Sequence, residues 1–555
     1  MIAESKIDNV RQVTPRNDPG ATCEGAGPTL MKRILATAAA ASIAATFVIA
    51  LPTSDSQQSS PTTTLASNSI KPQISTTLGE EIRSEVLLTT DDIAKAKKRV
   101  EDGVPKTVPK DAQPPSSSQS GRVDKGAGQS GKGDAKAFRK FMNEARSYAA
   151  KAKEHPYKIE EKPKATTGLS MENANAWTHS YAVGDTPPGV LEQLCFSNTE
   201  TQYTVMFDRY TYCTRQPFTI DYWEVDSVTG EKKDHLGTSS GRMEIFGQNY
   251  TDTRSTRQFA RIQKDSVTYD WGLIDNYTTA PGIYLSLNGE CEAALTLCST
   301  LQPAATMTWG SWNGNATWFK WNSDSGTSGM YGRDKLGAHY VKMHAYTDTA
   351  ELKTETPAIV GTRLVRCDSA TYFAAPRPET CIYLETIPRV EYSTDADSPN
   401  KEVAQHIQDA FDNPDATYPT SQDSKEIPGR YDGTYAPESL HRITPSLHAS
   451  WLNANASHKD AACSQTGDYA TTGLPYNLQT KTGQECDEYP FRSTLEGAAN
   501  QNWDFSVRAV TDRQNSSAGG SLSAFYESDR ILAYDASLPD PDISNDTFYV
   551  QIHDF

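Results

Sequence analysis

Several side chains near the C-terminal end of the sequence could together hold a metal ion and activate water. Asp487 and Glu488 are adjacent, Glu496 follows shortly after them, and Asn515 lies in a later polar cluster. Carboxylate and amide oxygens are suitable ligands for Mg²⁺ or Mn²⁺, and a cation would offset the repulsion between neighbouring carboxylates. One carboxylate could then act as a general base. These residues indicate a hydrolytic metal site, with a solvated acidic turn as the alternative interpretation.

The neighbouring residues suggest how such a site would treat a phosphate group. Arg492, Arg508 and Arg513 lie near the carboxylates in the sequence, and guanidinium groups are well suited to binding phosphate oxygens. Asn515 precedes a run of small residues, 516–521, whose backbone amides could approach a phosphate closely. Surface ion pairs for the arginines and a helix N-cap for Asn515 are the alternatives.

Histidine is absent from this part of the sequence. None lies between His458 and His553, so we expect any acid–base chemistry here to depend on carboxylates. His406, in a predicted helix earlier in the chain, is interpreted as a structural residue.

Residues 389–555 are predicted to form a separate α+β unit that positions these side chains. Alternating apolar residues predict strands, and apolar residues spaced by three and four predict helices. The expected strands are 388–392, 505–510, 530–534 and 547–552, and the expected helices are 401–411 and 518–527.

Residues 168–388 are predicted to form an all-β, sandwich-like middle domain. Short aromatic and β-branched runs, such as 205–212 and 218–225, alternate there with clusters of turn residues. The many aromatic side chains could contact a cell wall or a carbohydrate, but packing within the sheets is the simpler interpretation. This part of the sequence holds no evident catalytic constellation.

The chain begins with a predicted targeting signal. Residues 1–30 form an upstream extension, and residues 31–51 combine two cations with an apolar run, which is typical of a cleaved secretory signal. We therefore expect a secreted, extracellular protein without a stable membrane span. A membrane anchor through Ile34–Leu51 is the alternative.

Residues 52–165 are predicted to be a disordered, low-complexity linker with short helices. Serine, threonine, proline and glycine are frequent there, and such a composition buries too little apolar surface to fold alone. One short helix is expected at 90–100. A second, at 135–160, has a basic amphipathic pattern and is interpreted as a solvated spacer.

The cysteines agree with export. Eight of the nine follow the predicted signal, and an even number in an exported chain predicts four disulfides. Proximity along the chain favours the pairs Cys195–Cys213, Cys291–Cys298, Cys367–Cys381 and Cys463–Cys486. A zinc site is disfavoured, because no CxxC spacing occurs.

Length and charge limit the possible functions further. A chain of 555 residues is expected to contain more than one domain, and its net charge of -17 argues against a nonspecific nucleic-acid coat protein. An enzyme that holds DNA through a local basic patch and a metal ion remains compatible with this charge.

The order of several motifs in residues 389–555 resembles the NucA/NucB-type secreted deoxyribonucleases. The motifs are EVAQHI at 402–407, CDEYP at 486–490, the Glu496–Gly497 pair and the Gln514–Asn515 pair. This chain departs from the family's Asp-Asn-Arg loop, since it has Gln514, Asn515 and Ser516 there. Arg513 could replace the missing arginine.

The resemblance implies a C-terminal α+β nuclease domain of the ββα-metal type. It implies a secreted bacterial endonuclease that hydrolyses DNA with little sequence specificity and uses Mg²⁺ or Mn²⁺. Asp487 would be the general base, Glu488 would support the site or contact the metal, and Asn515 would be a metal ligand. Glu496 would order the loop. Arg508, like Arg513, would hold substrate phosphates.

Two other functions remain possible at this point. The chain could be a non-enzymatic secreted protein, associated with the cell wall or adhesive, in which the middle domain is the functional part. It could also be a toxin whose nuclease domain acts on competitors.

Overall fold

The computed structural model describes residues 82–103, 135–151, 187, 192, 195–196, 204–249, 252–300, 302–326, 331–347, 358–373, 378–433, 435–500 and 502–553. The predicted upstream extension, the signal segment and most of the predicted linker therefore lie outside the described residues. All of these described residues belong to one compact unit. In the part of the chain that is described, no helix is long and apolar enough to cross a membrane.

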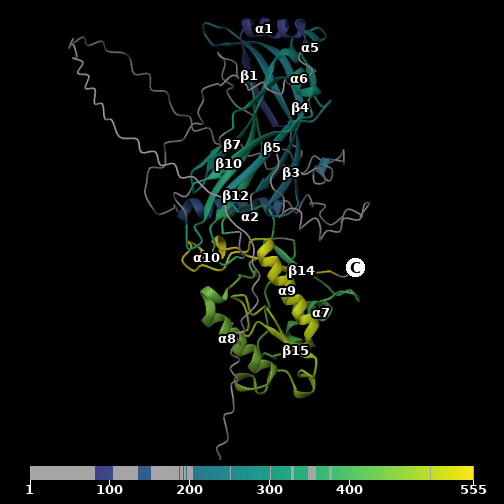
Figure 1. Cartoon of the computed structure of the whole chain (residues 1–555), viewed down its shortest axis with the longest axis vertical. Helices are drawn as coiled ribbons and strands as arrows, with labels where there is room; N and C mark the ends of the chain where they lie inside the picture. Colours follow the sequence, from purple (N-terminus) through teal and green to yellow (C-terminus); the bar gives the residue numbers. More distant parts are fainter. Residues whose placement is uncertain are drawn as a thin grey trace, which may run out of the picture. The chain divides into compact units, whose positions relative to one another are not determined.

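Most of the described residues before 389 fold into strands that we call the β region, coloured from purple (β1) through teal to green in Figure 1. The strands are β1 (Ile82–Leu88), β2 (Thr204–Met206), β3 (Thr211–Val225), β4 (Lys232–Asn249), β5 (Ser255–Ile262), β6 (Thr268–Asp270), β7 (Tyr284–Ala293), β8 (Cys298–Thr300), β9 (Ala305–Thr308), β10 (Phe319–Ser325), β11 (Gly337–Tyr346), β12 (Ala358–Asp368) and β13 (Thr380–Tyr383). Short helical segments lie at α5 (Asp275–Thr278), η1 (Ala280–Gly282) and α6 (Trp309–Gly314).

These strands form two sheets. The larger has the order β1-β3-β4-β5-β10-β8, with β2 and β6 beside β3 and β4, and the smaller has the order β13-β12-β11-β7-β9. Phe218 and Ile245 of the larger sheet share one buried cluster with Leu285 and Val360 of the smaller sheet. The two sheets therefore pack through a common core, and the predicted β-rich middle region is confirmed. Buried tryptophans, including Trp309, belong to this core, as the simpler interpretation of the aromatic residues required.

Part of the predicted linker is ordered structure. β1 pairs in parallel with β3, and α1 (Thr90–Glu101) follows it, close to the expected helix 90–100. Thr89 and Asp92 form a capping box at the start of α1, which explains why the helix begins there.

The second expected helix, α2 (Ala135–Lys151), is also present, but it is not a solvated spacer. Its side chains Phe138, Phe141, Met142 and Ala145 are buried. The amphipathic helix is therefore present as predicted, but its apolar side packs against the rest of the fold and is not exposed to solvent.

The C-terminal region, residues 389–553, combines helices and strands as predicted. Its elements are β14 (Arg389–Ser393), α7 (Lys401–Asp412), η2 (Pro414–Ala416), α8 (Pro445–Cys463), η3 (Gly467–Tyr469), η4 (Tyr476–Leu478), β15 (Gln484–Tyr489), β16 (Ser506–Thr511), α9 (Asp512–Ser528), α10 (Pro541–Ser544) and β17 (Tyr549–His553). β14 pairs in parallel with β17, and β15 pairs antiparallel with β16. A second buried cluster joins β14, α7, β15, α9 and β17.

Two predictions in this region need correction. α9 begins at Asp512 and not at 518, because packing of Ala518, Leu522 and Phe525 stabilises a helix whose two glycines weaken it locally. Residues 530–534 are not a strand. The order β15, β16, α9 is a β-β-α succession, and its assignment to the ββα-metal class remains a prediction.

All four predicted disulfides are present. They join Cys195 to Cys213, Cys291 to Cys298, Cys367 to Cys381 and Cys463 to Cys486. Cys463 ends α8 and Cys486 lies in β15, so the last of these bonds ties a helix to the strand that carries Asp487.

Candidate active site

The β15–β16 hairpin separates the two adjacent carboxylates. Successive side chains of a strand point to opposite faces. Glu485 and Asp487 lie on the face where α7 and α9 supply their partners. Cys486 and Glu488 lie on the other face, where Cys486 is bonded to α8. Because Asp487 and Glu488 are adjacent residues of one strand, their side chains lie on opposite faces and do not form a single paired site.

Asp487 is held by a short chain of buried hydrogen bonds. Its Oδ2 lies 2.7 Å from His406 Nδ1, and His406 Nε2 lies 2.8 Å from Ser506 Oγ. His406 is fully buried, and only 7% of Asp487 is exposed. A neutral imidazole can donate from Nδ1 to the carboxylate and accept the Ser506 hydroxyl at Nε2. The hydrogen bond from His406 is made to Oδ2 and does not involve Oδ1. Because the carboxylate is rigid, this bond also fixes the position of Oδ1.

Glu488 has a different environment. Burial, together with the neighbouring Asp487 charge, raises the pKa of Glu488 to about 7, although Lys459 and Arg492 act in the opposite direction. Lys459 lies on α8 one turn before Cys463, which agrees with a Glu488 side chain directed toward that helix. A carboxyl group with this pKa is partly protonated at neutral pH.

Asn515 lies in the first turn of α9 and is not its N-cap, since the N-cap is Thr511. Its Nδ2 donates to Glu485 Oε2 at 2.9 Å. An amide beside an exposed carboxylate suits a hydrated Mg²⁺ or Mn²⁺, which keeps several waters and needs few protein ligands. Glu488 faces the other side of the hairpin and does not join this pair. Among the described residues, no group of three or more His, Cys, Asp or Glu side chains could hold a metal ion.

The three arginines differ in their availability to a substrate. Arg508 forms an ion pair with Asp409 of α7, with Nη2 and Oδ2 2.6 Å apart. Arg492 is exposed and donates from Nε to the Leu452 carbonyl at 3.2 Å. Arg513 is exposed in the first turn of α9, next to Asn515 in the sequence. All three retain surface access that a phosphate contact would require, but Arg508 would have to leave Asp409.

Glu496 orders its loop through a second histidine. Its Oε1 lies 2.7 Å from His441 Nδ1, and its Oε2 accepts the His441 backbone N–H at 2.9 Å. His441 is buried, and its Nε2 has no hydrogen-bond partner within the described residues. The structure thus brings Glu496 together with His441, and Asp487 with His406.

The expectation that acid–base chemistry here depends on carboxylates stays a prediction, but a histidine does contact one of them. The sequence reasoning considered only the segment between His458 and His553, whereas His406 lies 81 positions before Asp487 in the chain. The sequence did hold one usable signal, because His406 occupies the apolar side of helix 401–411 beside Val403 and Ile407. A buried polar residue on such a face needs a partner. Glu485 and Ser506 carried no comparable signal.

The comparisons with known proteins bear on this region alone. No curated protein and no solved structure matches the chain. The family model described as Deoxyribonuclease NucA/NucB matches residues 440–535, which include α8, β15, β16 and α9, with the residues Asp487 and Asn515. β14 and α7 lie outside the matched segment, although α7 supplies His406. Residues 440–535, in the C-terminal part of the chain, are thus similar to the deoxyribonuclease NucA/NucB family.

Proposed function

We propose that this protein is an exported, metal-dependent nuclease that hydrolyses phosphodiester bonds of DNA with little sequence specificity. The observation that carries the proposal is the buried Ser506–His406–Asp487 chain of hydrogen bonds, of which Ser506 and Asp487 lie within the segment matched by a deoxyribonuclease family. A carboxylate held in one orientation is suited to removing a proton from an attacking water.

Each residue has a defined role in this proposal. Asp487 accepts the proton of water, and His406 holds the carboxylate so that little reorganisation is needed during the reaction. Asn515 and Glu485 would hold Mg²⁺ or Mn²⁺, which when bound stabilises negative charge on the phosphate and the leaving oxygen. Arg513 and Arg492 would bind neighbouring phosphates of the DNA strand.

Export is supported by the four disulfides and by the signal-like sequence at 31–51. Expression of the full chain in a bacterial host with an export pathway tests this part. We expect the mature protein in the medium with a new N-terminus soon after residue 50. A cell-bound protein that retains Ile34–Leu51 would favour the membrane anchor.

Plasmid nicking tests the enzymatic function. Purified protein with Mg²⁺ or Mn²⁺ is expected to convert supercoiled DNA to nicked and linear forms, and EDTA is expected to abolish the reaction. Asp487→Ala should lower the rate by orders of magnitude. Asp504→Asn is a matched control, because Asp504 is a similarly buried carboxylate that accepts the Glu426 backbone N–H. Wild-type protein that cleaves neither DNA nor RNA with any divalent metal would exclude the proposed function.

A further inference from the structure

A buried network of charged residues joins the β region to the end of α9. Arg366 of β12 contacts Asp546 and Asp368, and Arg209 contacts the other oxygen of Asp546 at 3.2 Å. Arg530, two residues after α9, contacts Asp368 at 2.7 Å. None of these five residues is more than 7% exposed. Two arginines and one aspartate therefore come from the β region, and one of each comes from the C-terminal region.

Opposite charges meet in this network, and their interaction favours the ionised forms of Asp546 and Arg366. Burial alone would raise the pKa of Asp546, but the Arg366 and Arg209 guanidinium groups lower it to about 2. Burial would lower the pKa of Arg366, whereas Asp546 and Asp368 raise it above its usual value. Removing one partner would leave an uncompensated charge in the interior, which is far more costly than breaking a surface pair.

Arginines of the β region also bind the main chain at the end of α9 and after it. Arg209 Nη1 donates to the carbonyl of Asp529, the C-cap of α9, at 2.8 Å. Arg366 Nη2 donates to the Arg530 carbonyl at 3.2 Å, and Arg333 Nη2 donates to the Ala533 carbonyl at 2.7 Å. Side chains of the β region thus take the place of a neighbouring strand at the carbonyls of residues 529, 530 and 533, and residues 530–534 do not form the expected strand.

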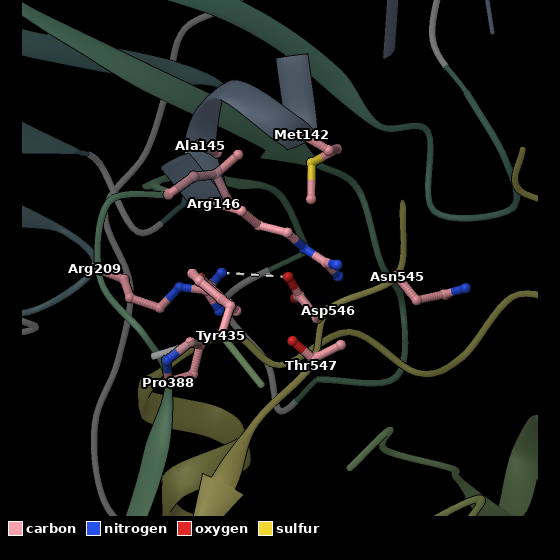
Figure 2. A pocket seen from close by; sticks show the side chains of 10 residues that line it. Met142, Ala145, Arg146, Arg209, Pro388, Tyr435, Asn545, Asp546 and Thr547 are labelled. Atoms are coloured by element: carbon pink, nitrogen blue, oxygen red, sulfur yellow. Dashed lines mark hydrogen bonds and ion pairs between the residues drawn. The ribbon is translucent and has the colours of Figure 1, made fainter. Parts of the chain in front are cut away.

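Helix α2 also packs against this junction, by which we mean the contact between the β region and the residues that follow α9. Its Arg146 side chain lies over the Tyr435 ring of the C-terminal region, and its Met142 and Ala145 line the same pocket as Arg209 and Asp546. Figure 2 shows Arg209 and Asp546 facing one another across this pocket, with Arg146 reaching into it from α2. The junction is therefore built from three separate parts of the chain.

α9 connects the junction to the candidate active site. Asn515 lies in its first turn and Ser528 is its last residue, so about 20 Å of helix separates them. A tilt of about 5° around the C-terminal end would displace Asn515 by about 1.7 Å. Ala518, Leu522 and Phe525 pack one side of α9 into the core, whereas Gly519 and Gly520 make no side-chain contacts, so the contacts beyond its C-terminal end add to this packing in fixing its direction.

We propose that the Arg209–Arg366–Asp368–Arg530–Asp546 network is a positioning device that sets α9, and through it Asn515, in the geometry needed for DNA cleavage. The inference rests on the proposed nuclease function and adds a role for the β region. That region is then a built-in partner of the nuclease site. It acts through α9 without touching the substrate.

A double-mutant cycle on the full chain tests the proposal. Arg366→Met, Asn515→Ala and the double variant are compared by kcat and KM for cleavage of a short DNA duplex. Displacement of a catalytic group by about 1 Å can cost about a hundredfold in rate. We expect Arg366→Met to lower kcat by tenfold to a hundredfold, by this reasoning, with KM changed less than about twofold. In the Asn515→Ala background the same substitution should lower kcat less than about twofold, because the two act through one group.

Two further variants separate positioning from stability. Arg333→Ala removes a partly exposed contact to the same segment and should lower kcat moderately in a protein that folds normally. Val360→Ala weakens the core of the β region without touching α9 and should leave kcat unchanged at temperatures where the protein is folded.

The outcomes are distinguishable. Equal losses from Arg366→Met in both backgrounds, or a loss of kcat in Val360→Ala like that in Arg366→Met, would overturn the positioning role. An active Asn515→Ala variant would overturn its route through Asn515. If the wild type has no nuclease activity, the proposed function itself has failed, and the cycle has no substrate reaction to measure.

Discussion

Replacing His406 by asparagine and by glutamine should affect DNA cleavage differently, because only one of these two residues can keep the hydrogen bond to Asp487. An asparagine side chain can place an N–H donor near the position of Nδ1, whereas the longer glutamine places one near Nε2. His406→Asn therefore keeps a donor for Asp487 and loses the bond to Ser506. His406→Gln keeps a partner for Ser506 and leaves Asp487 without its donor.

The size of the difference follows from the bond that each variant loses. A hydrogen bond to a charged group contributes about 1.5–3 kcal/mol, whereas one between neutral groups contributes about 1 kcal/mol. If the bond orients Asp487 for catalysis, His406→Gln should lower kcat/KM by roughly 10- to 150-fold. His406→Asn should lower it by less than about tenfold. Both variants remove the same buried ring, so their free energies of unfolding should differ only by the difference between the two lost bonds, about 0.5–2 kcal/mol.

The assay is steady-state cleavage of a fluorescent DNA duplex with Mg²⁺ or Mn²⁺, with circular dichroism and urea unfolding as checks on folding. Asp504→Asn again serves as the control for a buried polar substitution. Equal kcat/KM values for the two His406 variants, at a temperature where both are fully folded, would refute the reasoning that His406 acts through Asp487. A larger loss in His406→Asn would point to Ser506 as the important partner.

Three further predictions concern stability. In urea unfolding, the free energy of unfolding of Glu488→Gln should equal that of the wild type at pH 4 and exceed it by about 2 kcal/mol at pH 8. The reason is that wild-type Glu488 must ionise in the fold as the pH rises from its unfolded pKa through about 7. Equal stability of the two proteins at both pH values would contradict this. Asp546 has a pKa of about 2 in the fold, so its ionised form should contribute about 2.5 kcal/mol to the free energy of unfolding. This contribution is lost as the pH falls from about 4 to below 2. Asp546→Asn should lack this part of the acid transition. Serine at both Cys463 and Cys486, which close a loop with a separation of 23, should lower the free energy of unfolding by about 3 kcal/mol; a loss below about 1 kcal/mol would show that the unfolded chain gains little freedom.

The features that sequence reasoning predicted are those with local causes. The four disulfides join near neighbours in hairpins and loops, so proximity along the chain was a sound guide. Helix 401–411 and strand 505–510 show their periodicity within a few residues, and both are present as α7 and β16. Asp487 was found from its own motif, which the family match includes.

The features that it missed depend on contacts between distant parts of the chain. His406 meets Asp487 across 81 positions, and Arg366 meets Asp546 across 180. The opposite orientations of Asp487 and Glu488 required knowledge that residues 484–489 form a strand. The basic amphipathic pattern of residues 135–160 predicts a solvated spacer, and only the fold shows that the apolar side of α2 is covered.

The most direct test of the central claim is the ratio of kcat/KM values for DNA cleavage by the wild type and by Asp487→Asn, measured at saturating Mg²⁺ or Mn²⁺. Asparagine keeps the shape of the side chain but cannot accept a proton from water, and loss of a general base typically costs about 10²–10⁴-fold. We expect a ratio in that range, with the substituted protein as well folded as Asp504→Asn. A ratio below about tenfold would contradict the assignment of Asp487 as the residue that activates water.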